Sequence, residues 1–180
     1  MKFVKTIRAP LELEDIRSLQ VGDEVLVEGT IYAARDQAHQ RMAEAIRAGR
    51  ELPFDLRGQI IYYVGPCPAP PGRVIGSAGP TTSGRMDAYA PLLIARGLRV
   101  MIGKGSRNQE VKKAMRENGA VYLLTVGGAG AYLAERITAA EVIAYPELGP
   151  EALYRLEVRD FPCIVAIDAE GHDIYERPKE

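Results

Sequence analysis

Cysteine and histidine are scarce in this sequence, and tryptophan is absent. The only cysteines are Cys67 and Cys163, so no disulfide framework is expected and both thiols should be reduced. Two cysteines also cannot close a four-cysteine zinc or iron–sulfur site. The only histidines, His39 and His172, exclude a three-histidine catalytic metal site. We therefore expect no metal to be held by this chain alone.

A charge bias and long apolar runs are also missing. The chain carries 23 basic and 24 acidic residues, a net charge of −1, which argues against nucleic-acid binding through bulk positive charge. No run of 18 apolar residues is present, so no membrane-spanning helix is expected. The opening MKFVKTIRAP has three basic residues but no continuous apolar stretch, so we expect no secretory signal and a cytoplasmic protein.

What is present is an ordinary globular composition, with 47% hydrophobic and 26% charged residues in 180 positions. This length predicts one domain, residues 1–180. Hydrophobic periodicity predicts alternating strands and helices, and hence an α/β fold with a parallel or mixed sheet and helices packed on it. The strands expected after the N-terminal one are 24–32, 59–64, 98–102, 121–126, 142–145, 153–158 and 163–167, and the helices are 11–19, 35–48, 86–94, 108–118 and 129–136.

Residues 65–80 are rich in proline and glycine. Proline fixes the backbone and glycine reaches unusual dihedral angles, so we interpret this stretch as a shaped loop with a short strand over 73–75. The alternative is a linker between two domains. Serine and charged residues are too few for a flexible tether, which favours the loop.

The segment GPTTSGRMD, residues 79–87, lies between this loop and an amphipathic helix. Thr81, Thr82 and Ser83 are candidate helix caps, and free N–H groups at a helix start attract anions. Arg85 follows Thr81 by four positions, so both side chains can face one carboxylate or phosphate. An ordinary cap with a solvated arginine is the alternative.

Two further segments follow strands and carry cations. In RDQAH, Arg35 and His39 are one helical turn apart, near the end of a strand, where ligands often bind in α/β sheets. In IGKG, Lys104 stands between two glycines after an apolar strand, without the spacing of a phosphate-binding P-loop. A solvent-exposed arginine and a surface or capping histidine remain the alternative for the first segment.

A fourth segment, GGAGA at residues 127–131, stands between a strand and a helix. Its N–H groups can cradle an anion, although its glycine spacing does not fit a dinucleotide-binding fingerprint. Close packing of a helix start is an equally good explanation. Together the four segments supply Arg35, Arg85 and Lys104, and three cations around one pocket fit a dicarboxylate or a phosphorylated metabolite.

The arrangement of several of these segments resembles the β-type chain of the iron–sulfur hydro-lyases, the class I fumarate hydratases and L-tartrate dehydratases. The resemblance extends from about Leu11 to about Tyr175. It is carried by GTIYAARDQAHQR, GSAGPTTSGRMDAY, IGKG, VGGAGAYL and YPELGPEALYRLEVRDFPCIV.

The resemblance implies a swivelling β/β/α domain and the reversible addition of water to a dicarboxylate double bond. It also implies a 4Fe-4S cluster held by three cysteines. This chain has only two cysteines and so lacks that set of ligands. The cluster is therefore expected on a separate α subunit, in a hetero-oligomer, and this chain alone should be inactive.

Residue roles also follow from the resemblance. Thr81 is similar to the family's hydroxyl base, and Arg35 is the candidate cation that stabilises its alkoxide. Arg85 and Lys104 would bind the substrate carboxylates, and Asp36 and His39 would support them. No metal ligand is assigned to this chain.

Three hypotheses follow for the function. The leading one is the β subunit of a two-chain fumarate hydratase. The second is the β subunit of L-tartrate dehydratase, because no residue in the sequence reveals which dicarboxylate is chosen. The third, of a different class, is a dicarboxylate-binding domain without catalysis.

Overall fold

Seven strands form one mixed sheet in the computed structural model, which describes residues 3–125 and 129–176. Their order is β1-β2-β3-β4-β5-β7-β6, and β7 pairs with β2 as well. The α/β fold with packed helices is thus confirmed. The strands are β1 (Lys5–Arg8), β2 (Glu24–Ala33), β3 (Ile60–Tyr62), β4 (Val100–Gly103), β5 (Val121–Leu124), β6 (Ile137–Ala144) and β7 (Leu153–Ile167).

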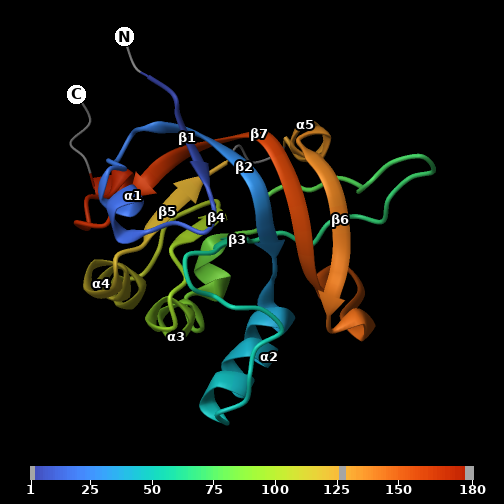
Figure 1. Ribbon diagram of the computed structural model, residues 1–180, viewed down its shortest axis with the longest axis horizontal. Helices are drawn as coiled ribbons and strands as arrows, with labels where there is room; N and C mark the ends of the chain where they lie inside the picture. The colour runs from blue at the N-terminus through green and yellow to red at the C-terminus, as the bar shows by residue number, and fades with distance from the viewer. Residues whose placement is uncertain (1–2, 126–128, 177–180) are drawn as a thin grey trace.

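The extra pairing closes the sheet into a ring. Strands β1, β2, β3, β4 and β5 run parallel to one another, and β7 pairs antiparallel with both β5 and β2. The long β7 therefore joins β5 back to β2, and β1 is paired with β2. Figure 1 shows β2 and β7 curving side by side over the top of this ring.

Helices cover the ring mainly from one side. They are α1 (Leu13–Arg17), α2 (Asp36–Arg47), α3 (Ala90–Ala95), α4 (Gln109–Asn118) and α5 (Gly130–Glu135), with short 3-10 turns η1 (Ser83–Met86), η2 (Pro146–Glu151) and η3 (Ile174–Glu176). In Figure 1, α2, α3 and α4 lie together below the strands. Within the described residues, no helix has the length and hydrophobicity needed to cross a bilayer.

Both faces of the parallel strands are buried, as the apolar run over 59–64 predicts. Ile60 and Tyr62 face a core inside the ring with Val100, whereas Ile61 and Tyr63 join a second core under the helices. Because successive side chains of a strand point to opposite faces, this alternation fills two separate cores.

Several predicted elements differ from the structure. The strands expected at 153–158 and 163–167 are one continuous strand, β7, because the ladder with β2 continues through Phe161 and Pro162. The helix expected over 86–94 is split into η1 and α3, with Pro91 near the start of α3. The strand expected at 142–145 is the end of a longer one, β6.

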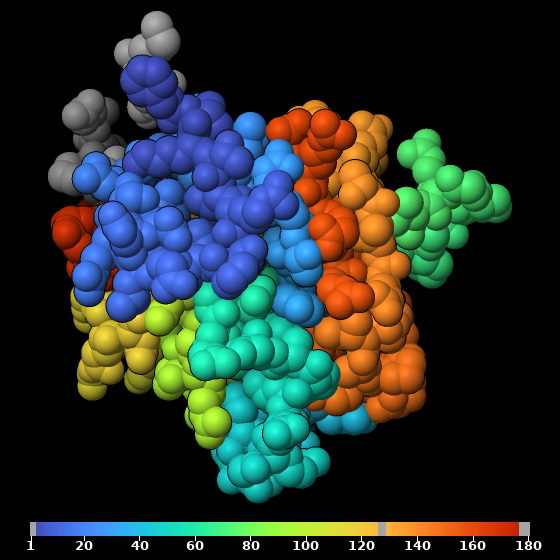
Figure 2. All heavy atoms as spheres, viewed as in Figure 1, coloured from blue at the N-terminus to red at the C-terminus, as the bar shows by residue number. Residues whose placement is uncertain are grey.

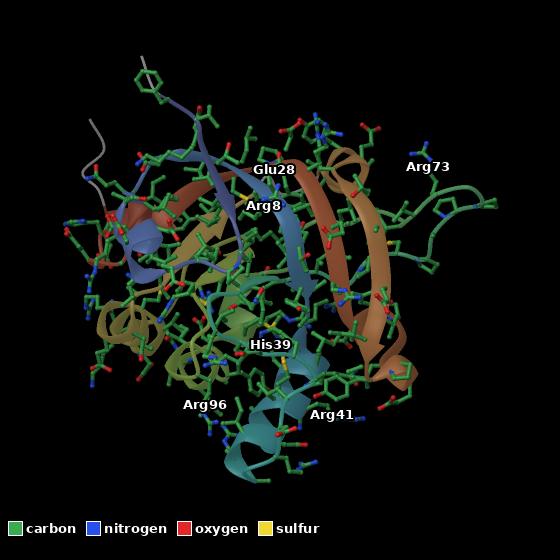
Figure 3. The ribbon with its side chains drawn as sticks, viewed as in Figure 1. Arg8, Glu28, His39, Arg41, Arg73 and Arg96 are labelled. Carbon is green, nitrogen blue, oxygen red and sulfur yellow. The ribbon has the colours of Figure 1, made fainter. Side chains whose placement is uncertain are left out.

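The proline-rich residues 65–80 form a projecting arm. Its two sides are joined by hydrogen bonds from the Cys67 N–H to the Ser77 carbonyl (2.9 Å) and from the Gly76 N–H to the Cys67 carbonyl (3.1 Å). Figure 2 shows the arm standing clear of the body, and Arg73 lies on it in Figure 3. The short strand predicted at 73–75 is wrong, since those residues are not in a strand. Strands β3 and β4, on either side of the arm, pair with each other, so it is not a linker between domains.

The two cysteines should differ sharply in reactivity. Cys67 is exposed on the arm, whereas Cys163 is buried inside the ring, and burial raises the pKa of its thiol. Because the thiolate is the reactive form, a maleimide should label one thiol in the native chain and two in denaturant, with Cys67→Ser abolishing the native reaction. Rapid native labelling of Cys163 would contradict the closed ring.

Candidate functional site

Three of the predicted segments meet at one rim of the ring. Arg35 follows β2, Gly65 follows β3 and Lys104 follows β4. Because these strands are parallel neighbours, their carboxyl ends lie at the same edge. Such edges are where α/β sheets commonly bind ligands.

The segment after the arm is fixed to the same rim by its backbone. The Thr81 N–H donates to the Tyr63 carbonyl at 2.7 Å, and the Ser83 N–H donates to the Lys104 carbonyl at 2.9 Å. Thr82 and Lys104 form an isolated parallel bridge. The predicted base, Thr81, therefore lies half-buried between the exits of β3 and β4.

The Arg35 side chain lies against Gly65, just after the carboxyl end of β3. A methyl group on Gly65 would lie 2.5 Å from Cδ and 2.6 Å from Nη1 of Arg35, so the arginine needs a glycine there. The backbone of Tyr63, two residues earlier, holds Thr81. Arg35 and Thr81 thus flank the same short segment, Tyr63–Gly65.

Arg85 and Asp36 form a bidentate ion pair. Nε of Arg85 donates to Oδ1 of Asp36 at 3.2 Å, and Nη2 donates to Oδ2 at 2.6 Å. Nε of Arg35 lies 4.0 Å from Oδ2 of Asp36 and 3.9 Å from Oε1 of Glu151, yet it is buried and makes no hydrogen bond. Asp36 therefore links two of the predicted cations, and Glu151 is a carboxylate that the sequence prediction missed.

Positive charge is in excess at this rim. Arg35, Arg85 and Lys104 are accompanied by two carboxylates, Asp36 and Glu151. Lys104 is exposed, and its ammonium makes no ion pair with the part of the chain that the structure describes. An anion fits this imbalance, because charge-assisted hydrogen bonds to it are about twice as strong as neutral ones.

His39 is not the surface residue that the alternative for RDQAH assumed. It lies near the start of α2, fully buried beside Tyr63 (Figure 3). Its Nδ1 is 2.8 Å from the Arg35 carbonyl, which only accepts, so Nδ1 carries the proton and Nε2 is left buried without a partner. Desolvation lowers the pKa of His39 from 6.5 to about 4, so the ring is neutral and supports the Arg35 backbone.

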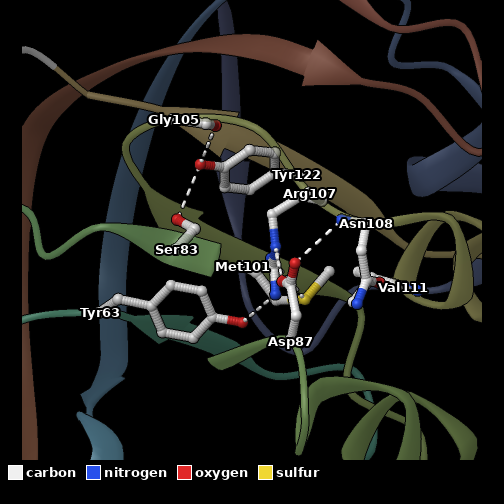
Figure 4. A network of polar contacts seen from close by, with 9 residues as sticks. All are labelled: Tyr63, Ser83, Asp87, Met101, Gly105, Arg107, Asn108, Val111 and Tyr122. Atoms are coloured by element: carbon white, nitrogen blue, oxygen red, sulfur yellow. Dashed lines mark hydrogen bonds and ion pairs between the residues drawn. The ribbon is translucent and has the colours of Figure 1, made fainter. Parts of the chain in front are cut away.

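The predicted helix capping is wrong. η1 begins after Thr82 without any side-chain cap, and the Ser83 hydroxyl instead meets the Tyr122 hydroxyl at 2.7 Å (Figure 4). Arg107 lies beside them, with Nε donating to Oδ1 of Asp87 at 2.7 Å. Asp87 and Arg107 were missed, although both are charged and lie in or next to the segments GPTTSGRMD and IGKG. Tyr122 could not be singled out, because in the sequence it is one more residue of an apolar strand.

The fourth segment, residues 127–131, lies partly outside the described residues, since Gly127 and Gly128 are not described. Gly130 starts α5, and its carbonyl accepts from the Ala78 N–H at 3.1 Å. A methyl group on Gly130 would collide with the Ser77 hydroxyl. The described part thus packs closely against the base of the arm.

The residues of this chain do not fit an iron–sulfur cluster. Cys67 is exposed on the arm and Cys163 is buried inside the ring, so the two thiols face different environments. Among the described residues, no group of three or more cysteine, histidine or acidic side chains is placed to hold a metal.

The fold and the rim together describe one class of protein. It is an α/β domain with a closed mixed sheet, whose parallel strands carry cations and a threonine near their carboxyl ends. Residues 3–178 match the family model described as Fumarase C-terminus. The chain belongs to this family.

Relatives agree with this assignment. The chain is 42% identical over 167 residues to the anaerobic class I fumarate hydratase of Escherichia coli, which covers 92% of this chain and 30% of that protein. It is 40% identical over 172 residues to a putative L(+)-tartrate dehydratase subunit beta of Methanocaldococcus jannaschii. This match covers 92% of this chain and 88% of that protein. The chain thus spans about a third of the class I fumarate hydratases but most of the subunit.

His39 should make the chain less stable in acid. Its pKa is about 4 when folded against 6.5 as the ordinary value, so the unfolded chain binds the proton more readily between these values. The associated stability is present above pH 6.5 and is lost as the pH falls toward 4, on the order of 3 kcal/mol in all. His39→Asn, which keeps a donor near the Arg35 carbonyl, should flatten this part of the pH profile.

Denaturant unfolding between pH 4 and 7 provides the measurement. His172→Asn is the control, because His172 is the other histidine and is exposed. The acid loss should persist in that variant. An unchanged profile in His39→Asn would show that His39 is not the titrating group.

Proposed function

We propose that this chain is the β subunit of a two-chain fumarate hydratase, which adds water reversibly to fumarate to give L-malate. The observation that carries the proposal is the rim, where the Thr81 backbone is held by Tyr63 and where Arg35, Arg85 and Lys104 outnumber the carboxylates of Asp36 and Glu151. Membership of the Fumarase C-terminus family supports the same reaction class.

Thr81 is the proposed base. In dehydration its alkoxide takes a proton from the carbon next to a substrate carboxylate, and in hydration its O–H returns that proton. Threonine is a weak acid, so the alkoxide requires a neighbouring cation. Arg35 suits this role because its Nε is buried without a hydrogen-bond partner, beside the backbone segment that holds Thr81.

Arg85 and Lys104 are the proposed carboxylate-binding residues. Asp36 engages Nε and Nη2 of Arg85, which orients the guanidinium and leaves its third nitrogen for substrate. Lys104 is exposed at the same rim, and its backbone is held by pairing with Thr82. Two cations on separate segments, Arg85 in η1 and Lys104 after β4, match the two carboxylates of one substrate.

The rest of the active site belongs to a partner in this proposal. The 4Fe-4S cluster is assigned to an α subunit, because the two thiols of this chain do not fit it. The class I relatives are about three times as long as the matched region, which supports a missing larger part. We therefore propose a cytoplasmic hetero-oligomer in which this chain alone is inactive.

L-Tartrate dehydratase is the second candidate. It is favoured by one observation, the 88% coverage of a protein named as a putative beta subunit of that enzyme. Assaying the complex with its α subunit on fumarate, L-malate and L-tartrate separates the two. Tight dicarboxylate binding by the isolated chain in calorimetry, with no turnover by the complex, would instead favour the non-catalytic binding domain.

Thr81→Ala should remove the base while leaving the rim in place. We expect kcat of the complex to fall about 10²–10⁴-fold, the usual contribution of a positioned base. Thr82→Ala is the matched control, since the neighbouring side chain is exposed and Thr82 pairs through its backbone. Full activity of the Thr81→Ala complex would make the assigned base wrong.

Lys104→Met should weaken the binding of one substrate carboxylate. The change keeps a long side chain but removes the charge, so kcat/KM should fall by on the order of 2–5 kcal/mol of transition-state stabilisation. Lys113→Met, an exposed lysine of α4, is the control. Steady-state kinetics over a range of substrate concentrations gives kcat and KM for both variants. Equal losses of kcat/KM in Lys104→Met and Lys113→Met would contradict a specific contact.

A further inference from the structure

A single buried tyrosine joins the two loops that carry the proposed site residues. The Tyr122 hydroxyl lies 2.7 Å from Oγ of Ser83, in the segment of Thr81 and Arg85, and 2.8 Å from the Gly105 carbonyl, next to Lys104 (Figure 4). Tyr122 comes from the middle of β5, and both it and Ser83 are completely buried.

The direction of these hydrogen bonds follows from their acceptors. The Gly105 carbonyl only accepts, so Tyr122 donates its single proton there. The Ser83 hydroxyl must then donate its own proton to the Tyr122 oxygen. Burial raises the pKa of Tyr122, which keeps the phenol protonated and able to donate.

The ring of Tyr122 is itself held on its other side. The Arg107 guanidinium lies 4.9 Å from the Tyr122 ring centre and 5.1 Å from that of Tyr63, and Nη2 also donates to the Tyr63 hydroxyl at 3.2 Å. Asp87, which follows Arg85 by two residues, accepts from Nε of Arg107 at 2.7 Å. The segment 81–87 is therefore tied to this network at both Ser83 and Asp87.

Ser83 has little room to move. Its N–H donates to the Lys104 carbonyl at 2.9 Å, and a methyl group on Gly103 would collide with its hydroxyl. One side-chain bond and one backbone bond thus fix Ser83 between Tyr122 and the Lys104 loop. Small displacements matter here, since misplacing a reacting group by about 1 Å can cost about 100-fold in rate.

We propose that Tyr122 is a positioning residue, which sets the spacing between Thr81 and Lys104 through its hydrogen bonds to Ser83 and Gly105. It touches no substrate in this arrangement. The kinetic part of the inference rests on the proposed function, whereas the coupling of the two loops does not.

Tyr122→Phe tests the proposal, because it removes only the hydroxyl and keeps the ring against Arg107. In the full chain, hydrogen exchange of the Ser83 amide should quicken on the order of tenfold, while amides in the middle of β4 keep their protection. Thr125→Val is the matched control: it removes another buried hydroxyl near the end of β5, one that donates to the Pro162 carbonyl at 3.0 Å. Unchanged Ser83 exchange in Tyr122→Phe would overturn the proposed coupling.

Kinetics of the complex supply the second readout. Tyr122→Phe should lower kcat about tenfold at temperatures where the variant is folded, and Thr125→Val should not. Adding Ser83→Ala to Tyr122→Phe should cost little more than Tyr122→Phe alone, because the loss of the phenol hydroxyl already removes the bond to Ser83. Wild-type kcat in Tyr122→Phe, or additive losses in the double variant, would overturn the positioning role. A wild-type complex without hydratase activity would instead reject the proposed function, and the exchange experiment would still decide the coupling.

Discussion

The parallel alignment of β2, β3, β4 and β5 is the constraint on which the site depends. Neighbouring parallel strands end at the same edge, so Arg35, Gly65 and Lys104 arrive at one rim although they are far apart in the sequence. The antiparallel β7 then pairs with both ends of this set and closes it. Because β7 covers the edges of β2 and β5 that would otherwise be open, the ring has no free edge there. Closure also fixes the curvature that brings the carboxyl ends of the strands together.

Cations serve two different purposes in this molecule. Arg107 and Lys112 are buried and fully partnered, by Asp87 and Tyr63 in one case and by Asp173 and Glu176 in the other. A buried charge is tolerated only with such partners, so these two belong to the fold. Lys104, exposed and without an ion pair among the described residues, carries no such compensation. A cation of this second kind is available to a ligand.

The sequence predicts the parts of this structure that depend on local pattern. The doubly buried strand around Ile60–Tyr63 follows from its continuous apolar run, and the placing of Arg35 and Lys104 after parallel strands follows from the alternation of strands and helices. Asp160 adopts a positive φ of 50° where the register of the β2–β7 ladder shifts, and the ladder resumes at Phe161 and Pro162, so the strand continues past the irregularity. Pairing across more than 100 residues decides this outcome, and local pattern does not contain it.

The polar network behind the site shows the same limit. Tyr122 lies in a continuously apolar strand, and its hydroxyl has partners only because Ser83 and Gly105 approach it from two other loops. Ser83, read as a helix cap, finds Tyr122 instead of its own helix start. Side chains whose partners are distant in sequence therefore escape local prediction even when their own segment is singled out.

Glycines at the strand exits explain how such a crowded rim is built. Gly65 after β3 leaves the space that the Arg35 side chain occupies, and Gly103 at the end of β4 leaves the space for the Ser83 hydroxyl. Any side chain at either position would push a polar group away from the sheet. The Thr81 N–H is bonded to Tyr63, two residues before Gly65, and Ser83 is bonded to Lys104, next to Gly103, so these two glycines lie beside the backbone bonds that hold the segment of the threonine.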